Sequence, residues 1–206
     1  MFDFDLAWTA HWALLGLSAP PQPELAALLV RWDEPPRRYH TLAHLQECLG
    51  LFDGVRGLAR RPGEVALAIW FHDAVYEPRR HDNEAESAAW AGRVLRQAGA
   101  AADVAGRVEA LVMATRHDVP AADDDARLVV DIDLAILGSD PVRYDEYARQ
   151  VREEYGFVPE IEFRARRAEV LRRFLARPAI YATPALAARF EGPARVNLAR
   201  EIDALA

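Results

Sequence analysis

The segment Tyr39-His40-Thr41-Leu42-Ala43-His44 carries two histidines at a spacing that could place them in one site. On a helix, His40 and His44 lie four residues apart and project from the same face. Two such imidazoles can serve as two metal ligands, or as one ligand and one proton donor. A pair of solvated surface histidines is the plainer interpretation, and the segment by itself is compatible with both.

Acidic residues in apolar surroundings form the second feature. His72 and Asp73 follow the apolar run VALAIWF, and Asp131 and Asp133 lie inside the run LVVDIDLAIL. An ionised carboxylate beside the core is costly unless an arginine, a capped backbone or a cation pairs with it. Because neighbouring helical residues point about 100° apart, His72 and Asp73 could both reach one ion near a helix end. A neutral imidazole and a carboxylate suit a transition-metal ion.

The elements that must position these residues are helices. Apolar residues recur at helical spacing nearly throughout, and no segment is typical of a strand alone. Asp82 or Asn83 is expected to cap one helix, and Asp140 with Pro141 is expected to begin another. The predicted helices cover residues 3–17, 23–33, 40–60, 63–73, 83–98, 101–117, 125–138, 141–155, 159–177 and 184–204. The sequence therefore predicts one compact all-α domain of nine or ten helices, with N-terminal helices at 1–35, a metal-site core at 36–138 and C-terminal helices at 139–206.

Composition excludes several kinds of chemistry. The 206 residues carry a net charge of −7, and all 25 basic residues are arginine. Without lysine, Schiff-base catalysis and the lysine-containing phosphate loop are both excluded. The single cysteine, Cys48, excludes an intramolecular disulfide and a cysteine-rich zinc site. It is interpreted as part of an apolar helix face.

The N-terminal sequence and the net charge also indicate where the protein is located and which partners it has. The N-terminus lacks the positive start of a signal peptide, and prolines interrupt the longest uncharged stretch, 6–23. We expect a cytoplasmic protein without a membrane partner. The acidic charge argues against long nucleic acid as a partner, and a homodimer remains an option.

The features together form the pattern H…HD…D. Twenty-eight residues separate His44 from His72, and sixty separate Asp73 from Asp133. On an all-α background this resembles the HD-domain superfamily of metal-dependent phosphohydrolases. The runs YHTLAHL, WFHDAVYEP, DNEAESA and DIDLAILG resemble one bacterial branch of that superfamily, and the resemblance covers nearly the whole chain.

The resemblance implies a ligand set for one or two divalent transition-metal ions (Mn, Ni, Zn, Fe or Co). His44, His72 and Asp73 would be ligands, together with Asp131 or Asp133. Related members have leucine after the last acid, which favours Asp133 and leaves Asp131 to support the fold. His117 would be an additional ligand if two ions bind, although a helix-end surface histidine is at least as good an interpretation.

The resemblance also implies catalytic and substrate-binding residues. His40 and His44 are similar to the YHN…H segment of class I cyclic-nucleotide phosphodiesterases, where the first histidine protonates the leaving oxygen; here Thr41 replaces the asparagine. Glu84 could orient or deprotonate a metal-bound water, or be a plain first-turn acid. The candidates for contact with the substrate are Arg80, Arg116 and Asn83.

The expected function is therefore phosphoester hydrolysis of a small phosphorylated metabolite or nucleotide, by a phosphomonoesterase or a phosphodiesterase. One alternative is a di-iron oxygenase of the HD type, which would need His117 and a further histidine such as His81. The other is a non-catalytic module in which a metal is structural or absent.

Overall fold

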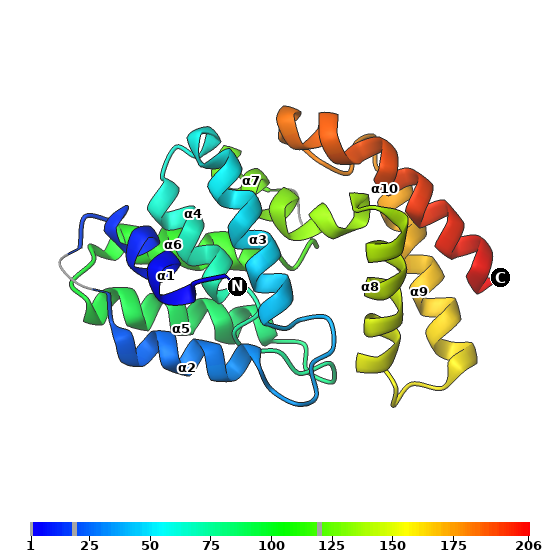
Figure 1. The fold of residues 1–206 in the computed structure, drawn as a ribbon, viewed down its shortest axis with the longest axis horizontal. Helices are drawn as coiled ribbons and strands as arrows, with labels where there is room; N and C mark the ends of the chain where they lie inside the picture. The colour runs from blue at the N-terminus through cyan, green and yellow to red at the C-terminus, as the bar shows by residue number, and fades with distance from the viewer. Residues whose placement is uncertain (1, 18–19, 119–120) are drawn as a thin grey trace. The chain divides into compact units, whose positions relative to one another are not determined.

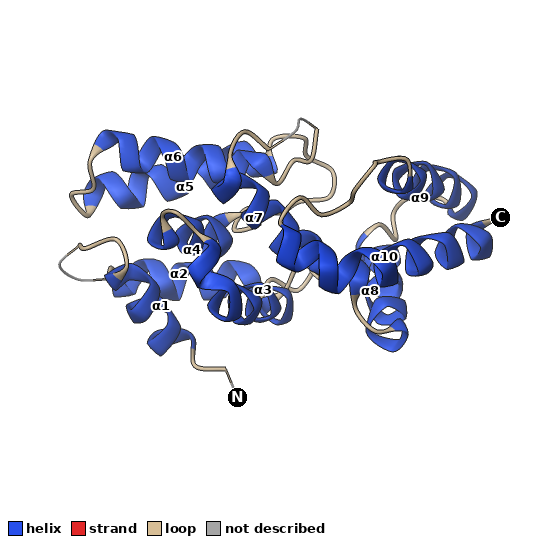
Figure 2. Ribbon diagram, turned by 90° about the horizontal axis from the view of Figure 1, so that it is seen from above, coloured by secondary structure: helices blue, strands red, loops and turns tan. Residues whose placement is uncertain are grey.

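The computed structural model of this protein describes residues 2–17, 20–118 and 121–206. Within these ranges the chain forms helices and loops, and no strand (Figure 1, Figure 2). The elements are α1 (Phe4–Ala13), α2 (Gln22–Trp32), α3 (Leu42–Val55), η1 (Arg56–Leu58), α4 (Pro62–Phe71), α5 (Asn83–Gln97), α6 (Ala102–Ala114), α7 (Asp124–Asp133), η2 (Leu134–Gly138), α8 (Pro141–Glu154), α9 (Glu160–Leu175) and α10 (Pro184–Leu205), where η marks a 3-10 helix. The prediction of an all-α fold with nine or ten helices is confirmed.

Local signals explain where several helices begin. The Asp140 carboxylate accepts hydrogen bonds from the backbone N–H groups of Val142 and Arg143 at 3.1 and 3.2 Å, as expected of an N-cap. Pro141 takes the first position of α8, where its missing N–H costs nothing. Asp82 is the residue before α5. Asp140 and Pro141 agree with the sequence predictions; Asp82 takes the predicted N-cap position, but its carboxylate accepts from Arg80 and makes no capping hydrogen bond.

Two predicted helices differ from the structure near the candidate site. The helix expected over 40–60 begins only at Leu42, because Thr41 is its N-cap and accepts a hydrogen bond from the Ala43 N–H at 3.3 Å. His40 precedes the helix, so the prediction that His40 and His44 share one helical face is wrong. The helix expected over 125–138 is an α-helix only as far as Asp133 and continues as η2.

The chain divides into two compact units, Met1–Val130 and Asp131–Ala206. The boundary falls inside α7, where the sequence has no linker composition. The predicted single domain with its three segments stays a prediction, and each unit is described by itself.

Helix α4 is the centre of the first unit. Its residues from Gly63 to Phe71 are all buried, and it packs against α1, α3, α5 and α6. A helix that is apolar on all sides is expected to be buried on all sides. A side chain at Gly63 would lie 2.8 Å from the Leu14 backbone, so glycine permits the close approach of α4 to the end of α1.

Tryptophan side chains join α4 to its neighbours. The Trp32 Nε1–H donates to the carbonyl oxygen of Trp70, and the Trp70 Nε1–H donates to Nδ1 of His11, both at 3.1 Å. These contacts fix the end of α4 that carries the HD dipeptide. The tryptophans that lie in the core are Trp8, Trp12, Trp32 and Trp70, and Trp90 is half-buried.

Helix α10 organises the second unit, in which it contacts η2, α9 and α8 (Figure 1). The Asn197 side-chain amide donates to the carbonyl oxygens of Leu137 and Ser139 at 3.0 and 2.9 Å. These carbonyls end η2 and would otherwise lack helical partners. A side chain at Gly138 would lie 2.6 Å from the Phe190 carbonyl oxygen, so η2 and α10 touch at this glycine.

A buried ion pair crosses from α9 to α10 in the second unit. The Arg167 guanidinium donates to both carboxylate oxygens of Glu201, at 2.8 and 3.2 Å, and the Tyr144 hydroxyl also donates to Glu201 at 2.5 Å. We expect Glu201→Ala to lower the free energy of unfolding by about 3 kcal/mol, because it leaves a largely buried guanidinium without its carboxylate. Tyr144→Phe removes only one hydrogen bond and should cost about 1 kcal/mol. Urea denaturation of the two variants gives the comparison, and equal losses would contradict this ranking.

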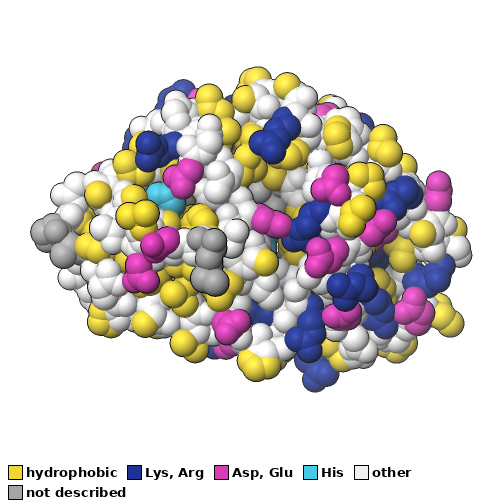
Figure 3. Space-filling model, viewed as in Figure 1, with side chains coloured by type: hydrophobic (Ala, Val, Ile, Leu, Met, Phe, Trp, Pro, Cys, Tyr) yellow, Lys and Arg dark blue, Asp and Glu magenta, His cyan; other side chains and the backbone are white. Residues whose placement is uncertain are grey.

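The surface of the C-terminal helices mixes both signs of charge. Figure 3 shows acidic and basic side chains interspersed over this part of the face that it draws. Neighbouring charges of opposite sign form ion pairs there, such as Arg149–Glu153 at 2.5 Å and Arg152–Glu160 at 2.9 Å. The absence of a nucleic-acid partner stays a prediction, as does the cytoplasmic location. Among the described residues, no helix is both long and apolar enough to cross a bilayer.

Candidate metal centre

The HD dipeptide and the second histidine of the YHTLAH segment meet inside the first unit. Helix α3 carries His44 in its first turn, and α4 ends at Phe71, so that His72 is its C-cap and Asp73 follows. Helices α3 and α4 pack against each other. Both imidazoles are buried, with 1% and 2% of their residue surfaces exposed.

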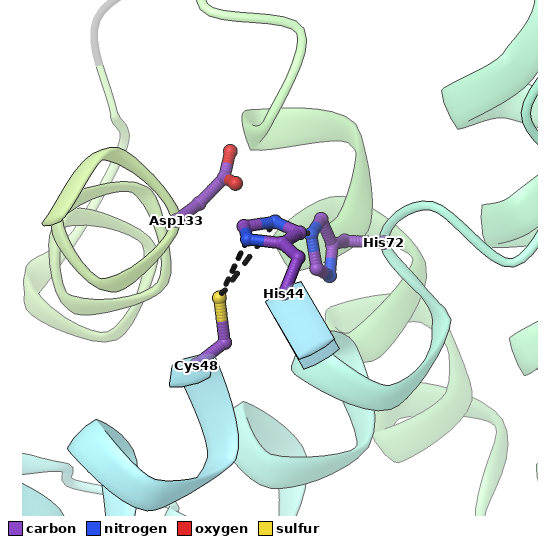
Figure 4. Close-up of side chains that lie close together, drawn as sticks. All are labelled: His44, Cys48, His72 and Asp133. Carbon is purple, nitrogen blue, oxygen red and sulfur yellow. Dashed lines mark hydrogen bonds between the residues drawn. The ribbon is translucent and has the colours of Figure 1, made fainter. Parts of the chain in front are cut away.

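Three potential ligand atoms lie close together at this junction. The Nε2 atoms of His44 and His72 are 3.2 Å apart (Figure 4). The Oδ2 atom of Asp73 lies 3.1 Å from His72 Nε2 and 4.0 Å from His44 Nε2. The structure therefore brings together three of the ligands that the sequence predicted.

The far side of each ring is held by a hydrogen bond. His72 Nδ1 lies 2.8 Å from the carbonyl oxygen of Ile69. A carbonyl only accepts, so Nδ1 carries the proton, and in the neutral ring the Nε2 lone pair faces His44 and Asp73. His44 Nδ1 lies 3.0 Å from the Tyr39 hydroxyl. An outer hydrogen bond of this kind fixes the tautomer and orientation of metal-binding histidines.

The spacing of these atoms fits a shared divalent ion. Ligand atoms bonded to one ion at about 2.0–2.2 Å lie roughly 3.0–3.5 Å apart, and two of the three separations are 3.1 and 3.2 Å. Two neutral imidazole nitrogens and one carboxylate form a donor set suited to a transition metal. These residues could hold a metal ion.

Cys48, which the sequence analysis interpreted as part of an apolar helix face, also borders this cluster. Its thiol is buried and its Sγ lies 3.7 Å from His44 Nδ1 and 3.8 Å from His44 Nε2 (Figure 4). His44, Cys48 and His72 each offer a ligand atom within 4.8 Å of the others. The signal that could have revealed Cys48 is its position four residues after His44 on α3.

Arg37 fixes the two loops that meet at the centre. Its guanidinium is almost completely buried and donates from Nη1 to the carbonyl oxygens of His40 and Asp73, at 3.1 and 2.7 Å. Nη2 donates to the carbonyl oxygen of Ala74 at 3.1 Å. Burial lowers the pKa of this guanidinium, and the nearby Asp73 carboxylate acts in the opposite direction. The sequence indicated only that this arginine precedes the histidine segment.

His40 lies beside the centre although it is outside α3. Its ring stacks on Tyr76 at a centroid distance of 4.0 Å, and its centroid is 5.9 Å from that of His44. The side chain is half-buried. The loop between His40 and Leu42 thus keeps the two rings near each other without placing them on one helix.

The predicted substrate-binding residues have partners of their own. Asn83 closes the loop before α5, because its side chain accepts from the Glu77 N–H at 3.2 Å and donates to the Glu77 carbonyl oxygen at 2.9 Å. Arg80 donates to both oxygens of Asp82 at 2.7 and 2.8 Å, and Arg116 lies 3.1 Å from Asp118. Contact of these residues with a substrate stays a prediction.

The remaining candidates in the first unit lie in two loops and one helix. Glu84 is half-buried in the first turn of α5, and His81 is exposed in the loop before it. His117 follows α6 with a positive φ of 57°. Within the described ranges, neither His81 nor His117 belongs to a group of three or more potential metal ligands.

The two acids of LVVDIDLAIL differ in their surroundings. Asp131, in the second unit, accepts hydrogen bonds from the backbone N–H groups of Ala182 and Thr183, at 3.0 and 2.5 Å, immediately before α10. Burial raises the pKa of this carboxyl, against the effect of the backbone hydrogen bonds. Asp131 therefore supports the N-terminus of α10, as the sequence analysis allowed. Asp133 is the last residue of α7 and is half-buried.

Comparison with known proteins gives no assignment, since no family model, curated protein or solved structure matches this chain. The resemblance to the HD-domain superfamily stays a prediction from the sequence.

The hydrogen bond between Tyr39 and His44 leads to a testable expectation. Tyr39→Phe keeps the ring but removes the hydroxyl that faces His44 Nδ1. We expect the affinity for a divalent transition metal to fall by roughly 10–100-fold, the usual effect of losing an outer partner of a ligand. Isothermal titration with Zn²⁺ measures this loss. Tyr181→Phe, in the second unit, is a matched control that removes a buried hydroxyl from the Leu134 carbonyl oxygen and should leave the affinity unchanged. An unchanged affinity in Tyr39→Phe would contradict the outer role of the hydroxyl.

Proposed function

We propose that this protein is a metal-dependent phosphohydrolase that cleaves a phosphoester of a small metabolite or nucleotide. The observation that carries the proposal is the convergence of the His44 and His72 Nε2 atoms with the Asp73 carboxylate, all within 4.0 Å. The sequence pattern H…HD…D supplies the link from such a centre to phosphoester chemistry.

Four side chains hold the ion in this proposal. His44, His72 and Asp73 come from the first unit, and Asp133 is assigned as the fourth ligand from the sequence pattern. Asp131 is excluded from this set because both of its carboxylate oxygens accept backbone hydrogen bonds. A divalent ion bound by two imidazoles and carboxylates would polarise a phosphoryl oxygen and lower the pKa of a water molecule that it holds.

His40 acts as the proton donor to the leaving oxygen. Three observations support this role: its ring is half-buried, its centroid lies 5.9 Å from that of His44, and it stacks on Tyr76. Stacking restrains the ring, and general acid catalysis requires a positioned group with a pKa near the working pH. Glu84 is proposed to handle the proton of the attacking water.

A small substrate agrees with the charge of the protein. The chain carries a net charge of −7, which disfavours a long polyanion. Arg80 and Arg116 are proposed to contact a single phosphate, although Asp82 and Asp118 already neutralise their charges. The substrate must therefore compete with these exposed ion pairs, whose contributions are individually small.

The proposal is tested with protein freed of metal and then loaded separately with Mn²⁺, Co²⁺, Ni²⁺, Zn²⁺ or Fe²⁺. Hydrolysis of p-nitrophenyl phosphate reports phosphomonoesterase activity, and hydrolysis of bis(p-nitrophenyl) phosphate reports phosphodiesterase activity. Nucleoside monophosphates and sugar phosphates follow, with release of inorganic phosphate as the measurement. Turnover that requires the added metal supports the proposal. A stoichiometrically bound ion without turnover of any of these esters would instead favour a non-catalytic metal-binding module, and two bound irons would favour the oxygenase.

A further inference from the structure

Cys48 lies in the buried core beside the candidate metal ligands. It is the only cysteine of the chain, it is 3% exposed, and it lies one turn after His44 on α3. Its Sγ lies 3.8 Å from His44 Nε2, the atom that faces His72. The ligand atoms of His44, Cys48 and His72 thus lie within 4.8 Å of one another.

We propose that Cys48 is a ligand of the ion held by His44 and His72, so that the centre is a mixed nitrogen, oxygen and sulfur site. This inference rests on the metal centre of the proposed function. Nitrogen and sulfur bound to one ion at about 2.1 and 2.3 Å are roughly 3.1–3.6 Å apart, depending on how many ligands the ion has. Sγ now lies 3.8 Å from His44 Nε2 and 3.7 Å from Nδ1, so the thiol reaches that geometry by rotating toward the Nε2 side of the ring, where the ligand atoms of His44, Cys48 and His72 all lie within 4.8 Å of one another. The thiol releases its proton to solvent as the sulfur–metal bond forms, so the bound ligand is a thiolate.

A thiolate ligand defines which ions the centre prefers. Soft sulfur favours borderline ions such as Zn²⁺ and Co²⁺, whereas Mn²⁺ and Mg²⁺ favour oxygen ligands. The donor set without Cys48 discriminates less between these classes. The structure therefore assigns Zn²⁺ or a similar borderline ion to the centre, in preference to Mn²⁺.

The test uses Co²⁺ as a spectroscopic probe of the whole 206-residue chain. A cobalt–thiolate bond gives a charge-transfer band in the near ultraviolet, and nitrogen and oxygen ligands do not. We expect metal-free native protein to develop this band on addition of Co²⁺, together with visible d–d bands. Because the chain has a single cysteine, the band reports on Cys48 alone.

The variant Cys48→Ser separates sulfur ligation from ion binding. It should lose the charge-transfer band but keep visible cobalt bands, because the imidazoles and Asp73 remain. Its Zn²⁺ affinity should fall by about tenfold or more, since even outer partners of a ligand contribute roughly 10–100-fold, and its Mn²⁺ affinity should change far less. Zinc X-ray absorption of the native protein should show one sulfur at about 2.3 Å. This last measurement needs no variant and therefore stands if Cys48→Ser fails to fold.

The outcomes distinguish this inference from the proposed function. Bound Co²⁺ with visible bands but no sulfur band, and zinc with nitrogen and oxygen neighbours only, would overturn the role of Cys48 and leave the metal centre intact. A native protein that binds neither Co²⁺ nor Zn²⁺, and in which His72→Ala changes nothing, would overturn both.

Discussion

The variant His72→Ala is expected to lose its bound transition metal and its phosphoester hydrolysis together. His72 Nε2 lies 3.2 Å from His44 Nε2 and 3.1 Å from the Asp73 carboxylate. Its removal takes away the ligand at the middle of the cluster. A metal contributes several kcal/mol to stabilisation of the developing charge, so we expect hydrolysis to fall by roughly 10³-fold or more. Metal content of the purified protein and phosphate release are the two measurements.

Two companion variants make this result specific. Asp73→Asn keeps the shape of the side chain and removes only its charge, so it should weaken metal binding without opening a cavity. His81→Ala removes an exposed loop histidine and should leave both metal content and hydrolysis as they are. Circular dichroism establishes that each variant keeps its helices. A His72→Ala protein that retains one ion per chain would contradict the ligand role, whatever its activity.

The order of the helices, and where several of them begin, could be predicted because their signals are local. A continuous apolar run marks α4, apolar periodicity marks α5, and Asp140 with Pro141 marks the start of α8. The start of α3 was misplaced by two residues, although Thr41 is a good N-cap residue. His40 and His44 were predicted to share one helical face, but His40 lies before Leu42, the first residue of α3.

The contacts that fix the candidate centre could not be predicted from the sequence, because they are tertiary. Burial of α4 brings His72 to His44 across 28 residues, and Arg37 joins the loop at His40 to the loop at Asp73. No sequence pattern identifies an arginine, such as Arg37, whose guanidinium donates to backbone carbonyl oxygens far along the chain. The partners of Asp131 lie 51 and 52 residues later in the chain, which is why its structural role remained one of two options. Residue types indicated which groups could bind a metal, and packing decided which of them meet.

Buried ligands also place a condition on the metal-free protein. His72 Nδ1 donates to the Ile69 carbonyl oxygen, so His72 Nε2 is an acceptor, and His44 Nε2 lies within hydrogen-bond distance of it, at 3.2 Å. A proton between these two nitrogens joins the rings when no ion is bound, and an ion that binds there displaces that proton. The same argument explains why the outer hydrogen bonds from Ile69 and Tyr39 matter: they hold the rings in place when no ion attracts them.

Replacement of the proposed proton donor is expected to have the second-largest effect. We expect His40→Asn to keep its metal and to lower kcat by roughly 10²–10³-fold on esters with poor leaving groups, since general acid catalysis contributes about 10²–10⁴-fold. Phenyl phosphate and alkyl phosphates are such esters. With p-nitrophenyl phosphate the leaving group needs little protonation, so the same variant should lose far less activity.

This dependence on the leaving group separates proton donation from a structural role of His40. If the ring only supported Tyr76, on which it stacks at 4.0 Å, all esters would be slowed to a similar degree. A proton donor must be protonated to act, so the native kcat should fall at high pH with poor leaving groups, and His40→Asn should lack that fall. His40→Gln should behave in the same way as His40→Asn. Equal losses on phenyl and p-nitrophenyl phosphate, with an unchanged pH profile, would assign the leaving-group proton to another residue.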